Sequence, residues 1–160
     1  MHSDLETIRA LYRYNSQVRK KYMRAIFRKV PPRERYRDRG ASFPSIVDIF
    51  VHVLDAYRWW FIFVYEDRLS EYTRLREVKR YTLREVAEEE KRIDGLVMGF
   101  VRRLKPADLD SVVSFRDGSR RKSLTLREML LHMIEEELQH RGEMNALFWQ
   151  LDLDPPITGY

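Results

Sequence analysis

The sequence predicts an all-α protein, folded as a four-helix bundle with a short β-hairpin before the last helix. Four segments place apolar residues at helical spacing, two of them begin with a Thr-x-x-Glu capping box, and proline pairs follow the first and the last. Four long helices joined by two longer connections are typical of a bundle. The chain has 160 residues, so a single domain covering residues 1–160 is expected.

The first predicted helix runs from about Ser3 to Lys29, with Ser3 or Asp4 as its N-cap. Pro31 and Pro32 end it, because proline lacks the amide proton that the interior of a helix needs. A polar and very basic loop follows.

The second predicted helix starts near Ser42 or Pro44 and continues to about Glu66. It is apolar on nearly all faces, which indicates a central helix rather than a surface one. Residues 46–65 are long enough to suggest a transmembrane span, but they carry four ionisable side chains, and charges at that density argue against one. These four side chains are Asp48, His52, Asp55 and Arg58.

The third predicted helix opens at Thr82, where Glu85 completes a capping box, and it runs to about Leu104. Pro106 ends it. In residues 111–125 an arm with Val112, Val113 and Phe115 is followed by the pair Asp117-Gly118 and a polar return arm. This order predicts a short hairpin, with a plain loop as the alternative.

The fourth predicted helix begins at Thr125, with Glu128 completing a second capping box, and continues to about Leu151. Pro155 and Pro156 stop the tail that follows it. The chain has no internal repeat, no low-complexity tract and no glycine-rich phosphate-binding motif.

Composition restricts the chemistry that the chain can support. It has no cysteine, which excludes a disulfide framework, a thiolate zinc site, an iron–sulfur cluster and a protein thiol nucleophile. Any metal must therefore be held by nitrogen and oxygen, from four histidines and the carboxylates. The N-terminus carries early charges and no apolar segment typical of a signal peptide, so a cytoplasmic protein is expected.

The charge balance has two interpretations. The net charge is +5, and 23 of the 30 basic residues are arginine, against five asparagines and glutamines together. A basic balance can indicate an acidic partner such as nucleic acid. Arginine in place of lysine, few amides and no cysteine also fit a thermophile-like composition, and we favour this second interpretation.

Two places put polar residues where a bundle should be apolar. His52 lies in the middle of the apolar second helix, and the fourth helix carries His132, Glu136 and His140 at spacings of four residues. Neighbours at that spacing lie about 6 Å apart along the helix, so Glu136 and His140 can bind a common atom, whereas His132 is too far away to share it. By angle alone Glu137 is the more buried of the two glutamates, and Glu137 with His140 is also a feasible pair, so spacing does not decide between them.

Two imidazoles and one carboxylate would leave coordination positions open. Such a site suits Zn²⁺ best, with Fe, Ni or Mn as alternatives. The ion would act as a Lewis acid on a coordinated water, thiol or substrate, and no other reactive group is evident in the chain.

The motifs also resemble a known family in their order along the chain. LYRYNSQ lies in the first helix, SIVDIFVHVLDAYRWW in the second, LTLREMLLHMIEEELQHRGEM in the fourth, and LDLDPP follows. Together they are similar to the DinB/YfiT-like family of metal-binding four-helix bundles. Each motif is loose alone, but their order, with the hairpin before the last helix, is fairly specific.

The resemblance implies a ligand set of His52, Glu136 and His140, and so selects Glu136 over Glu137. Most members of the family have histidine where this chain has Glu136. A His-Glu-His set is similar to the maleylpyruvate isomerase branch, which uses a low-molecular-weight thiol as a cofactor. The family and the aromatic excess together favour a homodimer.

Several neighbours of these positions have two interpretations. His132 is read as a helix-surface or cavity-wall residue outside the metal set. Asp48 and Asp55, one turn either side of His52, could orient a ligand imidazole or pair with arginines. The aromatic residues at the end of the second helix are expected in the core or a dimer interface, or else as the wall of a substrate pocket. These are Tyr57, Trp59, Trp60, Phe61 and Phe63.

The expected function is therefore a divalent-metal-dependent enzyme acting on a small molecule, either a thiol-dependent transferase or isomerase or a metal-assisted hydrolase. Two alternatives stay open. One is a nucleic-acid-binding module, supported by four arginines of the basic loop with Tyr36, and by the basic hairpin arm of residues 120–122, but weakened by acidic runs. The other is a scaffold without catalysis. The loop arginines are Arg33, Arg35, Arg37 and Arg39.

Overall fold

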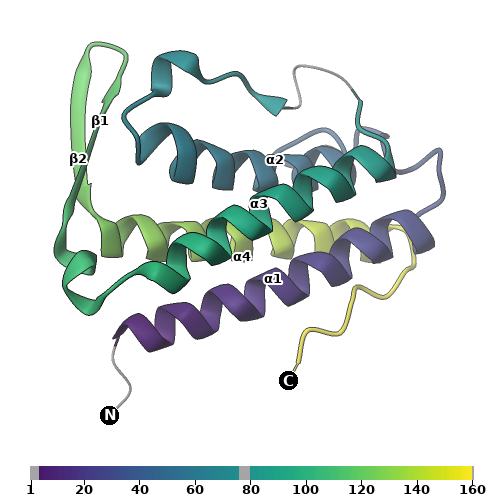
Figure 1. Ribbon diagram of the computed structural model, residues 1–160. Helices are drawn as coiled ribbons and strands as arrows, with labels where there is room; N and C mark the ends of the chain where they lie inside the picture. Colours follow the sequence, from purple (N-terminus) through teal and green to yellow (C-terminus); the bar gives the residue numbers. More distant parts are fainter. Residues whose placement is uncertain (1–3, 76–79, 160) are drawn as a thin grey trace.

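A computed structural model describes residues 4–75 and 80–159 and shows an all-α bundle with one β-hairpin (Figure 1). Helices α1 and α4 run in one direction, and α2 and α3 run in the other. The segment after α2 crosses back over the bundle before α3 begins, and this connection makes α2 and α3 parallel. The predicted fold class is confirmed. The four helices are α1 (Asp4–Lys29), α2 (Ile46–Arg58), α3 (Leu83–Arg103) and α4 (Leu126–Gln150).

Capping boxes set where three of the helices begin. The predicted boxes at Thr82 and Thr125 are both present, each with a reciprocal side-chain and backbone hydrogen bond to the glutamate three residues later. For α2 the predicted start at Ser42 or Pro44 is wrong, because Ser45 is the N-cap and Asp48 completes its box. Asp4 is the first residue of α1, and Ser3 lies outside the described residues.

The end of the second helix differs from the prediction. Regular α-helix stops at Arg58, and a π-helix (Trp59–Val64) continues it, so the predicted α-helix to Glu66 is wrong in form and slightly long. The Tyr65 amide donates to the Trp60 carbonyl at 3.0 Å, which is the five-residue spacing of a π-helix. The wider turn leaves Trp59 and Trp60 half-buried on one side, and buries Phe61, Phe63 and Val64 on the other.

The hairpin is formed by β1 (Val112–Asp117) and β2 (Arg120–Thr125), paired antiparallel. Asp117 pairs with Arg120, so the two residues of the turn are Gly118 and Ser119. Gly118 has φ +61°, a left-handed conformation that glycine adopts without a steric penalty. A short 3₁₀ helix (Pro106–Asp110) precedes the hairpin, and another (Leu69–Glu71) lies in the crossing segment.

A buried polar layer divides the apolar core into two clusters. One cluster gathers the first half of α1, the end of α2, the second half of α3 and the first half of α4; the other gathers the opposite ends. Within residues 4–75 and 80–159, no helix combines the length and apolarity needed to cross a bilayer. The buried polar side chains of the middle layer are Asn15, Ser16, Arg19, Glu90, Glu137, His140 and Arg141.

Candidate metal centre

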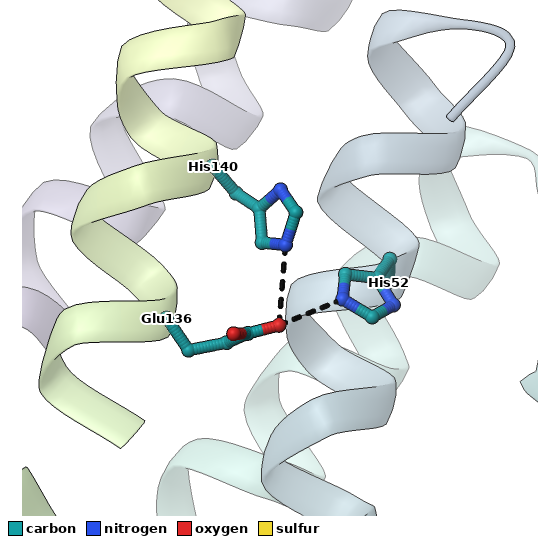
Figure 2. A group of neighbouring side chains, drawn as sticks. All are labelled: His52, Glu136 and His140. Carbon is teal, nitrogen blue, oxygen red and sulfur yellow. Dashed lines mark hydrogen bonds and ion pairs between the residues drawn. The ribbon is translucent and has the colours of Figure 1, made fainter. Parts of the chain in front are cut away.

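Three side chains from two helices meet at one carboxylate oxygen (Figure 2). The Oε1 atom of Glu136 lies 3.0 Å from Nε2 of His52 and 3.2 Å from Nε2 of His140. Helix α2 supplies His52, and one turn of α4 supplies the other two. Because α2 and α4 pack side by side, residues 84 positions apart in the sequence come within contact distance. The structure thus brings together all three predicted ligands.

The donor set fits a divalent cation. One potential ligand atom from each of the three residues lies within 4.8 Å of the other two. With metal–ligand bonds of about 2.0–2.1 Å, tetrahedral ligand atoms lie about 3.3 Å apart, close to the two contacts with Glu136. Two imidazoles and a carboxylate are ligands that Zn²⁺ accepts, and they leave a position open for a further group.

A surrounding set of side chains fixes the orientation of the two rings. Glu143 Oε2 lies 2.9 Å from Nδ1 of His140 and accepts a hydrogen bond from Ser42 Oγ at 2.5 Å. A carboxylate on Nδ1 keeps the proton there and presents the Nε2 lone pair to a metal. On the other side, the Phe43 ring stacks on His52 with centroids 4.0 Å apart and an interplanar angle of 24°.

The surroundings of Glu136 favour its ionised form. Hydrogen bonds from His140 and then His52 hold the pKa of Glu136 well below its ordinary value. Burial acts to lower the pKa of His140, but its contacts with Glu136 and Glu143 outweigh that effect and raise this pKa overall. Without a metal, the ionised Glu136 is thus stabilised by its contacts with the two imidazoles. A bound divalent cation would stabilise the same carboxylate charge.

The centre lies on the wall of a cavity of about 1000 Å³. The side chains of His52 and Glu136 are 25% and 22% exposed toward it, whereas His140 is only 5% exposed. Trp59 and Trp60 form another part of the wall. A space of this size is at the upper end of small-molecule sites.

Glu137 occupies a different environment from Glu136. It is buried, accepts hydrogen bonds from Arg19 at 2.9 Å and from the Tyr57 hydroxyl at 2.5 Å, and lies 3.5 Å from Arg141. Burial, and then Glu137, raise the pKa of Tyr57 well above its ordinary value, so this hydroxyl stays protonated and donates. The geometry therefore agrees with the resemblance in placing Glu136 rather than Glu137 beside the histidines.

The other residues that the sequence singled out near the ligands have separate roles. His132 is exposed, lines the cavity and meets the Trp60 ring edge-on at 5.2 Å, as expected for a cavity-wall residue. Of the two interpretations of Asp48 and Asp55, pairing with an arginine is confirmed for Asp55, and neither carboxylate contacts His52 among the described residues. Asp48 caps α2, and Asp55 binds Arg58 together with the Tyr72 hydroxyl and the Leu75 amide.

The aromatic group divides in the same way. Trp59 and Trp60 line the cavity, whereas Tyr57, Phe61 and Phe63 are buried in the bundle. Both expected roles, pocket wall and core, are therefore present in this group.

Sequence reasoning missed the residues that surround the ligands. Glu143 was predictable, because it lies three residues after His140 and so on the same side of α4. Ser42 and Phe43 were not, because they lie in the connection before α2, where no periodicity indicates which way a side chain points.

The arginines of the basic loop contact other residues of the protein. Arg35 donates to the carbonyls of Val30 and Phe27 at the end of α1. Arg33, Arg37 and Arg39 each form an ion pair with the buried Glu34. These contacts give Arg35 and Arg39 a structural role, which weakens the nucleic-acid interpretation for those two residues, whereas the side chains of Arg33 and Arg37 are 87% and 64% exposed.

The fold and the cluster together define a four-helix bundle with a candidate divalent-metal centre made of nitrogen and oxygen ligands. The chain belongs to the DinB family, whose family model matches residues 1–160. This confirms the resemblance read from the motifs. No individual curated protein matches the sequence closely enough to count as a relative.

Proposed function

We propose that the protein is a divalent-metal-dependent enzyme acting on a small molecule. The observation that carries this proposal is the His52–Glu136–His140 cluster, which lies on the wall of a cavity of about 1000 Å³. A site that only stabilises a fold normally closes its ligand shell with protein atoms, whereas three ligands beside a cavity leave room for a reacting group.

His52, Glu136 and His140 would hold the ion, and Zn²⁺ fits them best, with Ni, Fe or Mn as alternatives. When bound, a divalent ion supplies Lewis acidity, which lowers the pKa of a coordinated water or thiol. Glu136 contributes one negative charge, so the centre keeps a net positive charge that favours an anionic nucleophile.

The residues around the cluster have separate tasks. Glu143 holds His140 in orientation, and Phe43 covers the His52 ring and excludes water from that side. Trp59 and Trp60 offer an apolar surface for the body of a substrate. His132, on the same wall, is placed to hold or release a proton for the substrate.

The absence of cysteine restricts the source of any sulfur that reacts at the centre. Any sulfur at this centre must come from a low-molecular-weight thiol, because the chain has none of its own except in methionine. A cavity of this size can take a thiol and a second molecule together. The proposal therefore includes both thiol-dependent transfer or isomerisation and metal-assisted hydrolysis, which differ in whether a thiol binds at the centre.

Cobalt substitution tests the proposal. Purified without a histidine tag and loaded with Co²⁺, the protein should show visible ligand-field bands, and added 2-mercaptoethanol should produce a new near-ultraviolet band from sulfur bound to cobalt. Glu136→Ala should abolish both, and Glu135→Ala, which removes an exposed carboxylate beside it, should abolish neither.

The outcomes separate the alternatives. Cobalt bands that do not respond to thiol, together with metal-dependent cleavage of p-nitrophenyl acetate, would favour the hydrolase. Cobalt binding with no response to thiol and no turnover would favour a metal-binding scaffold. Less than about 0.3 equivalents of any transition metal after reconstitution would refute the proposal, because a three-ligand site should fill. The homodimer and a cytoplasmic location stay predictions.

A further inference from the structure

A pocket on α3 lies apart from the metal centre. Its volume is about 510 Å³, and none of its lining residues lines the cavity beside the candidate ligands. It is formed by the π-helix that continues α2 and by the second half of α3, which both lie toward the hairpin end of the bundle (Figure 1). The same π-helix serves both spaces, because Trp59 and Trp60 line the metal-side cavity and Phe61 lines this α3 pocket.

Three aromatic rings form much of the apolar surface of the α3 pocket. The Phe100 ring meets the Phe61 ring with centroids 5.2 Å apart at 89°, and the Tyr65 ring with centroids 4.8 Å apart at 85°. Phe61 is buried, whereas Tyr65 is 42% exposed. Rings packed edge to face leave faces and edges on which a further ring can pack. The pocket is therefore suited to a ligand that contains a ring.

Arg103 brings a positive charge to the α3 pocket. A Cβ added at Gly99 would lie 3.4 Å from Nη1 of Arg103, so the guanidinium lies back over the preceding turn of α3. Within residues 4–75 and 80–159, this guanidinium has neither an ion pair nor a hydrogen bond. Arg9 differs, because its guanidinium donates to three carbonyls at the end of α3. Arg103 has no such structural role among the described residues.

The two acidic side chains of the pocket already have partners. Glu66 pairs with Arg68 at 2.8 Å, and Asp108 accepts a hydrogen bond from the Lys105 amide at 2.6 Å. A guanidinium such as that of Arg103 binds a carboxylate through two parallel hydrogen bonds. The negative charges of Glu66 and Asp108 oppose any further negative charge nearby. The pocket therefore favours a ligand with a single negative charge over a phosphate or a nucleotide.

We propose that the α3 pocket binds a small aromatic monocarboxylate, with the carboxylate on Arg103 and the ring against Tyr65 and Phe100. A volume of about 510 Å³ is within the range of small-molecule sites and is enough for one molecule of one or two rings. Because Arg103 is exposed, water screens its charge, so a dissociation constant on the order of 0.1–1 mM is expected. The site needs no metal and does not rest on the proposed function.

An NMR titration of the backbone amides with 2-naphthoate tests the proposal. The largest shifts should fall within residues 61–66 and 96–104, which include most of the pocket. The dissociation constant should be the same with added zinc and after treatment with EDTA. The neutral analogue 2-naphthamide has the same rings and nearly the same shape, and it should bind about 10-fold more weakly because it cannot form charged hydrogen bonds with Arg103.

Three variants assign the contacts. Arg103→Gln should weaken 2-naphthoate about 10-fold and leave 2-naphthamide nearly unchanged. Arg102→Gln is the matched control: it removes the same charge from the next residue of α3, outside the pocket lining, and should change neither affinity. Tyr65→Ser should weaken both compounds to the same degree, about 3-fold or more. All three side chains are exposed, so the melting temperatures should stay close to that of the wild type.

Several results would overturn the proposal. One is the absence of shifts in residues 61–66 and 96–104 at about 10 mM 2-naphthoate. Others are equal affinity for the acid and its amide, or wild-type affinity for 2-naphthoate in Arg103→Gln. Shifts confined to the surroundings of His52 and Glu136, and seen only with zinc, would place the carboxylate on the metal instead. Binding in the α3 pocket by protein that takes up no zinc would support this site and refute only the proposed function.

Discussion

Glu136 and Glu137 are adjacent in the sequence but belong to different networks. Glu136 Oε1 lies within 3.2 Å of the Nε2 atoms of His52 and His140, at the wall of the cavity. Glu137 points into the polar layer of the bundle and binds Arg19. One turn of α4 thus supplies both a candidate metal ligand and a buried ion pair that holds this helix against α1.

Glu137→Gln should destabilise the fold. The substitution leaves the buried Arg19 with Glu90 and Asp94 as its anionic partners among the described residues. Removing one member of a buried ion pair typically costs about 3–5 kcal/mol, and we expect about 3 kcal/mol here because those two carboxylates remain. Urea denaturation of the metal-free protein measures the change.

Glu88→Gln is the control for that measurement. Glu88 forms an exposed ion pair with Arg84, one turn earlier on α3, so its loss should change the free energy of unfolding by less than about 0.5 kcal/mol. Equal effects of Glu137→Gln and Glu88→Gln would show that the Arg19 network contributes no particular stability.

Glu143→Gln should weaken zinc binding while all three proposed ligands remain. Glu143 contacts Nδ1 of His140 and orients its ring, and loss of such a partner typically lowers metal affinity about 10–100-fold. Competition with a chromogenic chelator measures it. Glu135→Gln removes the same charge from the same helix without touching either histidine, and its affinity should match the wild type.

Removal of the metal should lower thermal stability. At a free zinc concentration 100 times the dissociation constant, binding to the native state alone contributes about 3 kcal/mol, or about 5–10 °C in melting temperature for a chain of this length. Differential scanning calorimetry with and without EDTA measures the shift. In His52→Ala the two melting temperatures should coincide, and a shift of the same size in that variant would place the metal elsewhere.

Arg35→Ala should destabilise the end of α1. The Arg35 guanidinium donates to the carbonyls of Val30 and Phe27, and hydrogen bonds to a charged group are worth about 1.5–3 kcal/mol. Arg33→Ala removes a largely exposed side chain and should change stability by less than about 0.5 kcal/mol. If the loop served nucleic acid instead, both substitutions would weaken DNA binding at low salt and neither would change the denaturation midpoint.

The helix boundaries were predictable where local chemistry determines them. The boxes at Thr82 and Thr125 are short-range features, and both helices begin where the sequence places them. The Ser45 cap has the same kind of short-range pattern, with Asp48 in place of glutamate three residues later, but the prediction chose earlier residues.

The π-helix after Arg58 was not predictable from periodicity. Its sequence is apolar throughout, so it has no polar face from which the change from four- to five-residue hydrogen bonding could be read. In the wider turn, Trp60 lies on the cavity wall and Phe61 lies in the core. Packing across the whole bundle decides this placement.

The spacing of residues along the sequence predicts only part of the candidate centre. Periodicity on α4 places His140 on a buried face but allows either glutamate beside it, and no spacing along one helix links it to His52 on α2. The choice of Glu136 came from the family resemblance, and the packing of α2 on α4 agrees with it.

Anomalous diffraction at the zinc edge from crystals of the untagged protein tests the central claim most directly. The account predicts one peak per chain, about 2.0–2.1 Å from Nε2 of His52, Nε2 of His140 and a carboxylate oxygen of Glu136, beside the cavity. No peak at that point after reconstitution with zinc, or a peak coordinated by other residues, would contradict it.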